Sequence, residues 1–112
     1  MANDRWEEWV IGAAIKHDGL FGKLAARLKP EFFEDAKARL LWELCEQTLE
    51  RGDRVGMSTV LHTACLNMAN LYRLGGKDYL SQLISEAPCP EEAEEYAYGI
   101  AQKARCRLLG GP

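Results

Sequence analysis

Several motifs that carry catalysis or ligand binding are missing from this sequence. It has no G-x-x-x-x-G-K-[ST] phosphate loop, no G-x-S-x-G nucleophile turn and no H-E-x-x-H zinc pair. Its two histidines, His17 and His62, have no acidic or cysteine neighbour at a spacing that supports catalysis. The 4 cysteines form neither a C-x-x-C pair nor a Cys/His cluster, the arrangements that hold structural zinc. We therefore expect no catalytic residue, no metal site and no cofactor.

Strong positive charge and long apolar runs are also absent. The net charge is -3, and lysine and arginine are scattered among aspartate and glutamate, so no basic stripe would neutralise phosphates. No stretch reaches the roughly 20 apolar residues that span a bilayer. Asp4, Glu7 and Glu8 also stand where a signal peptide would be basic. We expect a soluble cytoplasmic protein that contacts no membrane and binds nucleic acid only weakly by itself.

No stretch alternates apolar and polar residues in the way that half-buried strands do. A chain of 112 residues is long enough for one hydrophobic core, and its 47% apolar composition supports such a core. We predict an all-α fold with a single domain over residues 1–112, built as a compact bundle of about six helices.

The most apolar helix is predicted over residues 35–51. Its polar residues gather in one narrow stripe, and apolar residues cover more than half of its circumference, so neighbours are expected on two sides. Asp35 is suited to cap its first turn, and Gly52 stands where a left-handed residue ends a helix. The polar stripe consists of Arg39, Glu43, Glu46 and Glu50. We therefore place this helix at the centre of the domain.

The other helices are located by apolar residues that recur every three and four positions. Asp18 and Ser58 stand where N-cap residues would begin two of these helices. The Gly75–Gly76 pair is typical of a turn between helices, and Pro30 favours a first helical turn. The predicted ranges are 4–17, 18–28, 58–65, 77–85 and 91–109.

Two of these helices carry apolar residues outside their core face. Ile11 and Ile15 lie one turn apart, opposite the core stripe of the first helix. Tyr98 and Leu109 lie on the side of the last helix turned away from its core stripe. Exposed apolar edges favour self-association into a dimer or higher oligomer, with these four residues as the interface. The alternative is that other helices cover the two isoleucines and that the other two are isolated surface residues.

The cysteines are expected to be small apolar residues in a reducing compartment, without disulfides. Cys45 lies on the helix predicted to be most buried, and Cys65 on a partly apolar helix. We also interpret the glutamates at the start of the last helix as a solvated end that complements the helix dipole.

A set of short motifs, in this order and spacing, resembles the N-terminal domain of DnaB-type replicative helicases over nearly the whole chain. The motifs are Glu8-Trp-Val-Ile-Gly12-Ala-Ala-Ile, Leu28-Lys-Pro30-Glu-Phe32-Phe33, Arg39-Leu-Leu-Trp42, Arg51-Gly-Asp-Arg-Val55, Gly75-Gly-Lys-Asp-Tyr79-Leu80-Ser-Gln-Leu83 and Tyr96-Ala97. The resemblance implies a non-catalytic interaction module. In that family such domains pair with one another, form the N-terminal collar of the hexamer and dock primase, while DNA contacts are made mainly elsewhere.

The chain departs from the family pattern at three places. Gly56 stands where an acidic residue is usual, and a glutamate stands where an asparagine usually precedes the final Tyr-Ala. The loop over residues 67–74 also differs from the family pattern in length or composition. The family's helical-hairpin linker and RecA-like ATPase domain are also missing. The chain is therefore not expected to act as an enzyme or as a helicase by itself.

Other interpretations remain open. The related helicase-binding domain of bacterial primases is similar, and the chain could also be a stand-alone phage or plasmid replication protein. A helix-turn-helix DNA-binding protein could be built from residues 58–74, although no basic recognition helix supports it.

Overall fold

Helices make up all the regular structure in the part of the chain that the structure describes. The structure is a computed structural model, and it describes residues 6–17, 19–66 and 72–108. Over these residues there is no strand, as the sequence predicts. The main elements are α1 (Trp6–Lys16), α2 (Leu20–Ala25), the 3-10 helix η2 (Pro30–Phe32), α3 (Ala36–Glu50), α4 (Met57–Cys65), α6 (Gly76–Ser85) and α7 (Pro90–Leu108).

The two ends of α3 lie where its capping residues predict them. The side chain of Asp35 accepts a hydrogen bond of 2.9 Å from the backbone N–H of Ala38. At the other end Gly52 adopts a left-handed φ of 87°. The N–H of Gly52 then bonds the carbonyl of Leu49 at 2.9 Å, and the N–H of Asp53 bonds that of Thr48 at 3.2 Å. These two bonds form a Schellman motif, which satisfies carbonyl groups at the end of the helix.

The helix with the most neighbours is α1. Its main contacts are with α2, α3, α6 and α7, whereas those of α3 are with α1, α4 and η2. The six consecutive residues from Val10 to Ile15 are all buried. Small residues make this enclosure possible, because a Cβ added at Gly12 would lie 2.7 Å from the carbonyl oxygen of Leu83 in α6. The domain is thus organised around α1 as much as around α3.

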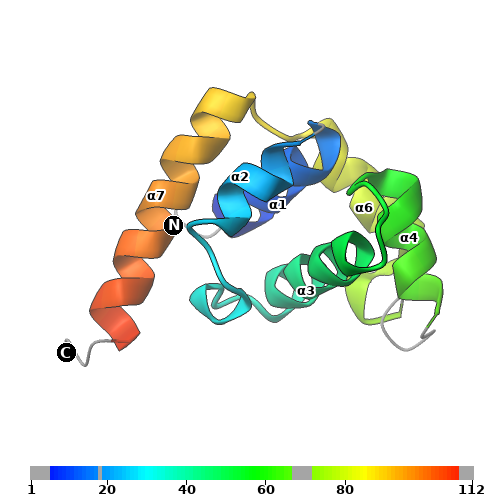
Figure 1. Cartoon of the computed structure of the whole chain (residues 1–112), viewed down its shortest axis with the longest axis horizontal. Coiled ribbons are helices and arrows are strands. Elements are labelled where there is room, and N and C mark those ends of the chain that lie inside the picture. Colours follow the sequence, from blue (N-terminus) through cyan, green and yellow to red (C-terminus); the bar gives the residue numbers. More distant parts are fainter. Residues whose placement is uncertain (1–5, 18, 67–71, 109–112) are drawn as a thin grey trace.

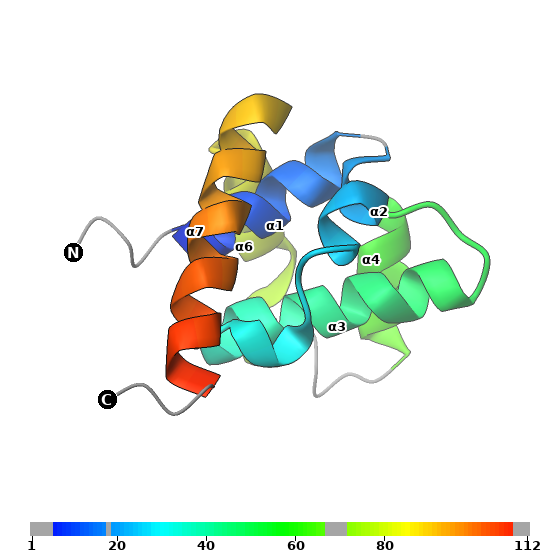
Figure 2. The same ribbon diagram turned by 60° about the vertical axis from the view of Figure 1, so that its left-hand side comes forward.

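The helices are arranged with α7 and α4 at opposite ends of the molecule. Figure 1 shows α1, α2 and α3 between them, and the turned view of Figure 2 keeps α7 and α4 apart. The helix α7 lies along α1, and α4 packs against α3 and α6. Surfaces on α7 and on α4 are therefore well separated.

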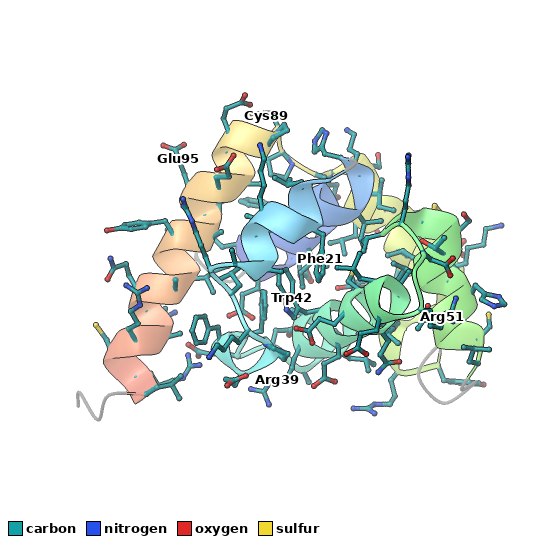
Figure 3. All side chains as sticks on the ribbon, in the orientation of Figure 1. Phe21, Arg39, Trp42, Arg51, Cys89 and Glu95 are labelled. Carbon is teal, nitrogen blue, oxygen red and sulfur yellow. The ribbon has the colours of Figure 1, made fainter. Side chains whose placement is uncertain are left out.

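An aromatic cluster joins α2, η2 and α3 in the core. Trp42 is fully buried, and its ring centroid lies 4.5 Å from that of Phe21 and 5.2 Å from that of Phe33 (Figure 3). The indole Nε1 of Trp42 is buried without a hydrogen-bond partner of acceptable geometry. Glu46, one turn later in α3, lies close enough for the indole to stabilise its carboxylate.

The start of α4 differs from the prediction. Gly56, not Ser58, is the N-cap residue, and the helix begins at Met57. The reason is a local hydrogen bond, because Thr59 Oγ1 accepts from the backbone N–H of Gly56 at 2.9 Å. Asp18, the other predicted N-cap, lies outside the described residues, and Gly19 in a left-handed conformation precedes α2. The Gly75–Gly76 turn is confirmed, with φ of 90° and 84°.

Candidate interaction surface

Ile11 and Ile15 do not form an exposed edge. Their exposed fractions are 0% and 4%, so both belong to the core. The side of α1 that carries Trp6 and Trp9 faces α7, whereas Gly12 faces α6. Since different helices cover different sides of α1, the prediction that its second apolar edge is free for a partner is wrong.

The helix α7 is held firmly along α1 by its inner face. The ring of Tyr96 stacks on Trp6 with centroids 5.4 Å apart and lies 5.6 Å from that of Trp9. Gly99 allows this approach, because a Cβ there would lie 2.7 Å from the Trp6 ring. The core residues of this face are Ala93, Ala97, Ile100, Ala101 and Ala104.

The last turns of α7 are tied to the segment around η2. Arg107 Nη1 donates to the Glu34 carboxylate at 2.8 Å, and Arg107 Nη2 donates to the backbone carbonyl of Glu31 at 3.0 Å. Lys103 Nζ lies 3.9 Å from the same carboxylate of Glu34. The helix α7 is thus attached to the domain at two places, through Tyr96 on α1 and through Arg107 on the segment around η2.

The outer side of α7 carries the exposed aromatic residue Tyr98, which is 59% exposed. Leu108 is also exposed, but it lies one turn after the buried Ala104 and so continues the inner side of the helix. The hydroxyl of Tyr98 accepts a hydrogen bond of 2.7 Å from Gln102 Nε2, which orients the ring along the helix. Arg105 is also exposed and lies seven residues after Tyr98, so it shares this side of the helix. We call Tyr98, Gln102 and Arg105 the α7 outer face. Leu109, predicted to belong to it, lies outside the described residues.

Sequence reasoning missed other exposed apolar side chains. Leu49 at the end of α3, Leu66 just after α4 and Tyr72 are all exposed. Leu49 belongs to the apolar part of the helix predicted over residues 35–51, but it is 49% exposed, next to the buried Thr48. No periodic pattern marks Leu66 or Tyr72, so nothing in the sequence identifies them.

The cysteine and histidine side chains differ in their exposure and contacts. Within the described ranges, no group of three or more His, Cys, Asp or Glu residues is arranged to hold a metal. Cys45 is buried, and burial raises the pKa of its thiol far above the usual value. Cys65, Cys89 and Cys106 are exposed, so the expectation that Cys65 is buried is wrong. His17 Nε2 lies 3.1 Å from the carbonyl oxygen of Pro88 and so links the end of α1 to the segment before α7.

The four glutamates at the start of α7 agree with a solvated helix end. Glu91, Glu92 and Glu95 are exposed and Glu94 is half-buried, and the helix ends with basic Arg105 and Arg107 in its last turn. This distribution of charge complements the dipole of α7. Among the helices of the described residues, none is long and apolar enough to cross a membrane.

Comparisons with known proteins agree with this geometry. The chain has the fold of the N-terminal domain of DnaB helicase from Mycobacterium tuberculosis, with a TM-score of 0.79 and 27% sequence identity over 88% of this chain and 68% of that chain. Among curated proteins no sequence matches the chain significantly. The profile of the family described as DnaB-like helicase N terminal domain matches residues 2–102, which is most of the sequence. The chain therefore belongs to the DnaB-like helicase N-terminal domain family.

Proposed function

We propose that the chain is a non-catalytic interaction module of a replicative DNA helicase, which self-associates and docks primase or another replication protein. The family match supports the helicase context. The observation that carries self-association is the α7 outer face, where Tyr98 is exposed on a helix whose inner side packs on α1. Exposed apolar area is about 25 cal/mol per Å² less favourable than buried area, so a symmetric partner is a natural cover.

The charges of α7 favour an antiparallel pairing of two copies. Glu91 lies seven residues before Tyr98 and Arg105 lies seven residues after it, and all three are exposed. A two-fold axis through Tyr98 would place Glu91 of each copy opposite Arg105 of the other. These two contacts between opposite charges, on either side of Tyr98, would fix the register of the two antiparallel α7 helices.

The experiment is light scattering over a concentration series. We expect wild-type protein to associate as concentration rises, and Tyr98→Glu to stay monomeric because two carboxylates would meet at the axis. Glu91→Lys and Arg105→Glu should each weaken association, and the double exchange should restore it because the opposite charges meet again. Lys77→Glu, an exposed substitution on α6, is the matched control and should associate as wild type does.

Two outcomes contradict this assignment. A wild-type protein that remains monomeric at high concentration would exclude self-association of this chain. Folded Tyr98→Glu protein that associates as strongly as wild type would show that another surface is used.

Docking of a replication partner is tested by titration with the labelled C-terminal domain of the primase from the same source. We expect saturable binding. Absence of binding, with the chain folded, would remove primase from the proposal and leave self-association unaffected.

The isolated chain is expected to hydrolyse no ATP, since its sequence contains no phosphate loop. Its net charge of -3 also predicts only weak, salt-sensitive binding to duplex DNA. Sub-micromolar affinity for random duplex at physiological salt would instead support the DNA-binding alternative.

A further inference from the structure

A groove of about 440 Å³ opens beside α4, on a part of the surface that the α7 outer face does not reach. It lies between the end of α1, the α3–α4 connector and the end of α6. Figure 1 shows α4 at the opposite end of the molecule from α7, so a ligand in the groove leaves the α7 outer face open. Its wall also includes residues of the first turn of α4, from Gly56 to Thr59.

The floor of the groove is apolar. Ile15 and Val55 are almost fully buried beneath it, and the side chains of Met57 and Ile84 are half-buried at its sides. A floor of this kind gains free energy when a bulky apolar side chain displaces its water.

The rim of the groove is basic. Lys16 and Arg54 both line it, and no acidic side chain does. Lys16 is exposed and forms no ion pair with the described residues. Arg54 makes an interaction within the chain, and its guanidinium group has five donors, so it can hold a second acceptor. Asp53, the acidic residue next to Arg54, is paired with Arg51 at 2.9 Å. The local charge therefore favours an anionic ligand.

The N-cap of α4 leaves room for a carboxylate. Gly56 has extended backbone angles of φ -157° and ψ 173° and offers no side-chain cap to the helix. A Cβ added there would meet only Thr59 Oγ1, at 3.8 Å, so the space in front of the helix is open. Helix N-termini usually receive an oxygen acceptor from Ser, Thr, Asp or Asn at this position.

We propose that this groove binds a short acidic segment of a partner protein, with a bulky apolar side chain on the floor and a neighbouring carboxylate between Lys16 and Arg54. The apolar floor favours a peptide over a free phosphate, and the basic rim disfavours a basic peptide. This inference rests on the proposed function as an interaction module, and it assigns the chemistry of one partner. It does not depend on self-association.

The probe is the fluorescein-labelled peptide acetyl-Glu-Asp-Leu-Leu-Asp-Glu-amide, followed by fluorescence anisotropy. We expect saturable binding that weakens as salt is added. The same peptide with alanine for both leucines, and a peptide with lysine for all four acids, should each bind at least about tenfold more weakly. All titrations are repeated in the Tyr98→Glu background, so that a failure of self-association and a failure of the groove are separate results.

Two pairs of protein variants test the placement. Lys16→Glu should weaken the acidic peptide about tenfold, whereas Lys23→Glu on the exposed side of α2 should not, because only Lys16 lines the groove. Gly56→Asp and Gly56→Asn should both raise the melting temperature by capping α4. Only Gly56→Asp should reduce peptide binding, because only its side chain brings a negative charge into the groove.

The proposal is overturned if the lysine peptide binds as well as the acidic one, or if Lys16→Glu and Gly56→Asp bind the acidic peptide as wild type does. It is also overturned if inorganic phosphate at millimolar concentration displaces the peptide and if Lys16→Glu and Gly56→Asp weaken phosphate binding as much as peptide binding. The groove would then be a simple anion site. No detectable binding of the acidic peptide to folded wild-type protein has the same consequence.

Discussion

The hydroxyl oxygens of Thr48 in α3 and Thr63 in α4 lie 2.6 Å apart in the fully buried interface between these helices. Each hydroxyl also reaches the carbonyl of its own preceding turn, Thr48 to Leu44 at 2.8 Å and Thr63 to Thr59 at 3.0 Å. One hydroxyl can therefore donate to its own helix while it accepts from the other. The pair satisfies the hydroxyl groups of both threonines and fixes the register of α4 on α3.

Removing one of these hydroxyls should cost more than half of what removing both costs. We expect Thr63→Val or Thr48→Val alone to lower the free energy of unfolding by about 1–2 kcal/mol, because the remaining hydroxyl loses a partner. The double variant should lose less than the sum of the two, since no unpaired group is left. Urea unfolding of the four proteins measures this cycle, and strict additivity would contradict the coupling.

Leu44 tests the contribution of α3 to the core. Its side chain is fully buried, so Leu44→Ala should lower the free energy of unfolding by about 2–5 kcal/mol through cavity formation. The exposed Gln47 on the same helix provides the comparison, and Gln47→Ala should change stability by less than about 0.5 kcal/mol. A loss of less than about 1 kcal/mol for Leu44→Ala would contradict the buried position of α3.

Replacing glycine with alanine should have opposite effects on stability at Gly12 and at Gly22. Alanine favours a helix over glycine by up to about 1 kcal/mol, and Gly22 has open space around it, so Gly22→Ala should raise the melting temperature. At Gly12 the new Cβ would lie 2.7 Å from the carbonyl oxygen of Leu83, and α1 and α6 would have to separate. Gly12→Ala should therefore destabilise by about 1–3 kcal/mol, and a stabilising effect would mean that the two helices are not in close contact.

The sequence was sufficient for features that depend on local chemistry. Asp35 and Gly52 bound α3 because capping and left-handed turns involve only residues within a few positions of each other. The Gly75–Gly76 turn has the same origin. The family resemblance, confirmed by the match over residues 2–102, also followed from short motifs.

Features that depend on distant parts of the chain could not be predicted. Whether the second side of α1 is exposed depends on where α6 returns, about 70 residues later, and Ile11 has no local property that reveals it. The run Gly12-Ala13-Ala14 is the sequence feature that indicates close packing on several sides of α1, because its small residues let neighbouring helices approach. The groove beside α4 combines three segments from distant parts of the chain, so no sequence motif marks it.

The cysteines should differ sharply in reactivity. In native protein, an aromatic disulfide reagent should label Cys65, Cys89 and Cys106, which are exposed. Cys45 should react only after unfolding, because it is fully buried and burial raises the pKa of its thiol, which leaves almost no thiolate. Mass spectrometry counts the labels, and reduction beforehand should not change the count because no disulfide is expected. Labelling of Cys45 under native conditions would show that the core opens around α3.

The carboxyl group of Glu46 should make the stability of the domain depend on pH, and the variant Glu46→Gln should lack this dependence. Burial raises the pKa of its carboxyl group, and the nearby carboxylates of Glu43, Glu50 and Glu31 raise it further, while the indole of Trp42 lowers it in part. The pKa in the folded state is therefore above the value of about 4.3 expected in the unfolded chain. Stability associated with this group is complete below the unfolded pKa and is lost as pH rises through the folded pKa.

The free energy of unfolding of Glu46→Gln, relative to that of wild type, should therefore increase as pH rises from about 3.5 to about 7. At the lower pH the wild-type carboxyl is protonated, and at the higher pH it is ionised. Urea unfolding at both pH values measures the difference. Gln47→Ala, one residue further along α3, removes no ionisable group, and its effect on stability should be the same at both pH values. If the effect of Glu46→Gln is equally independent of pH, then the carboxyl group of Glu46 is not destabilised by its burial and its acidic neighbours.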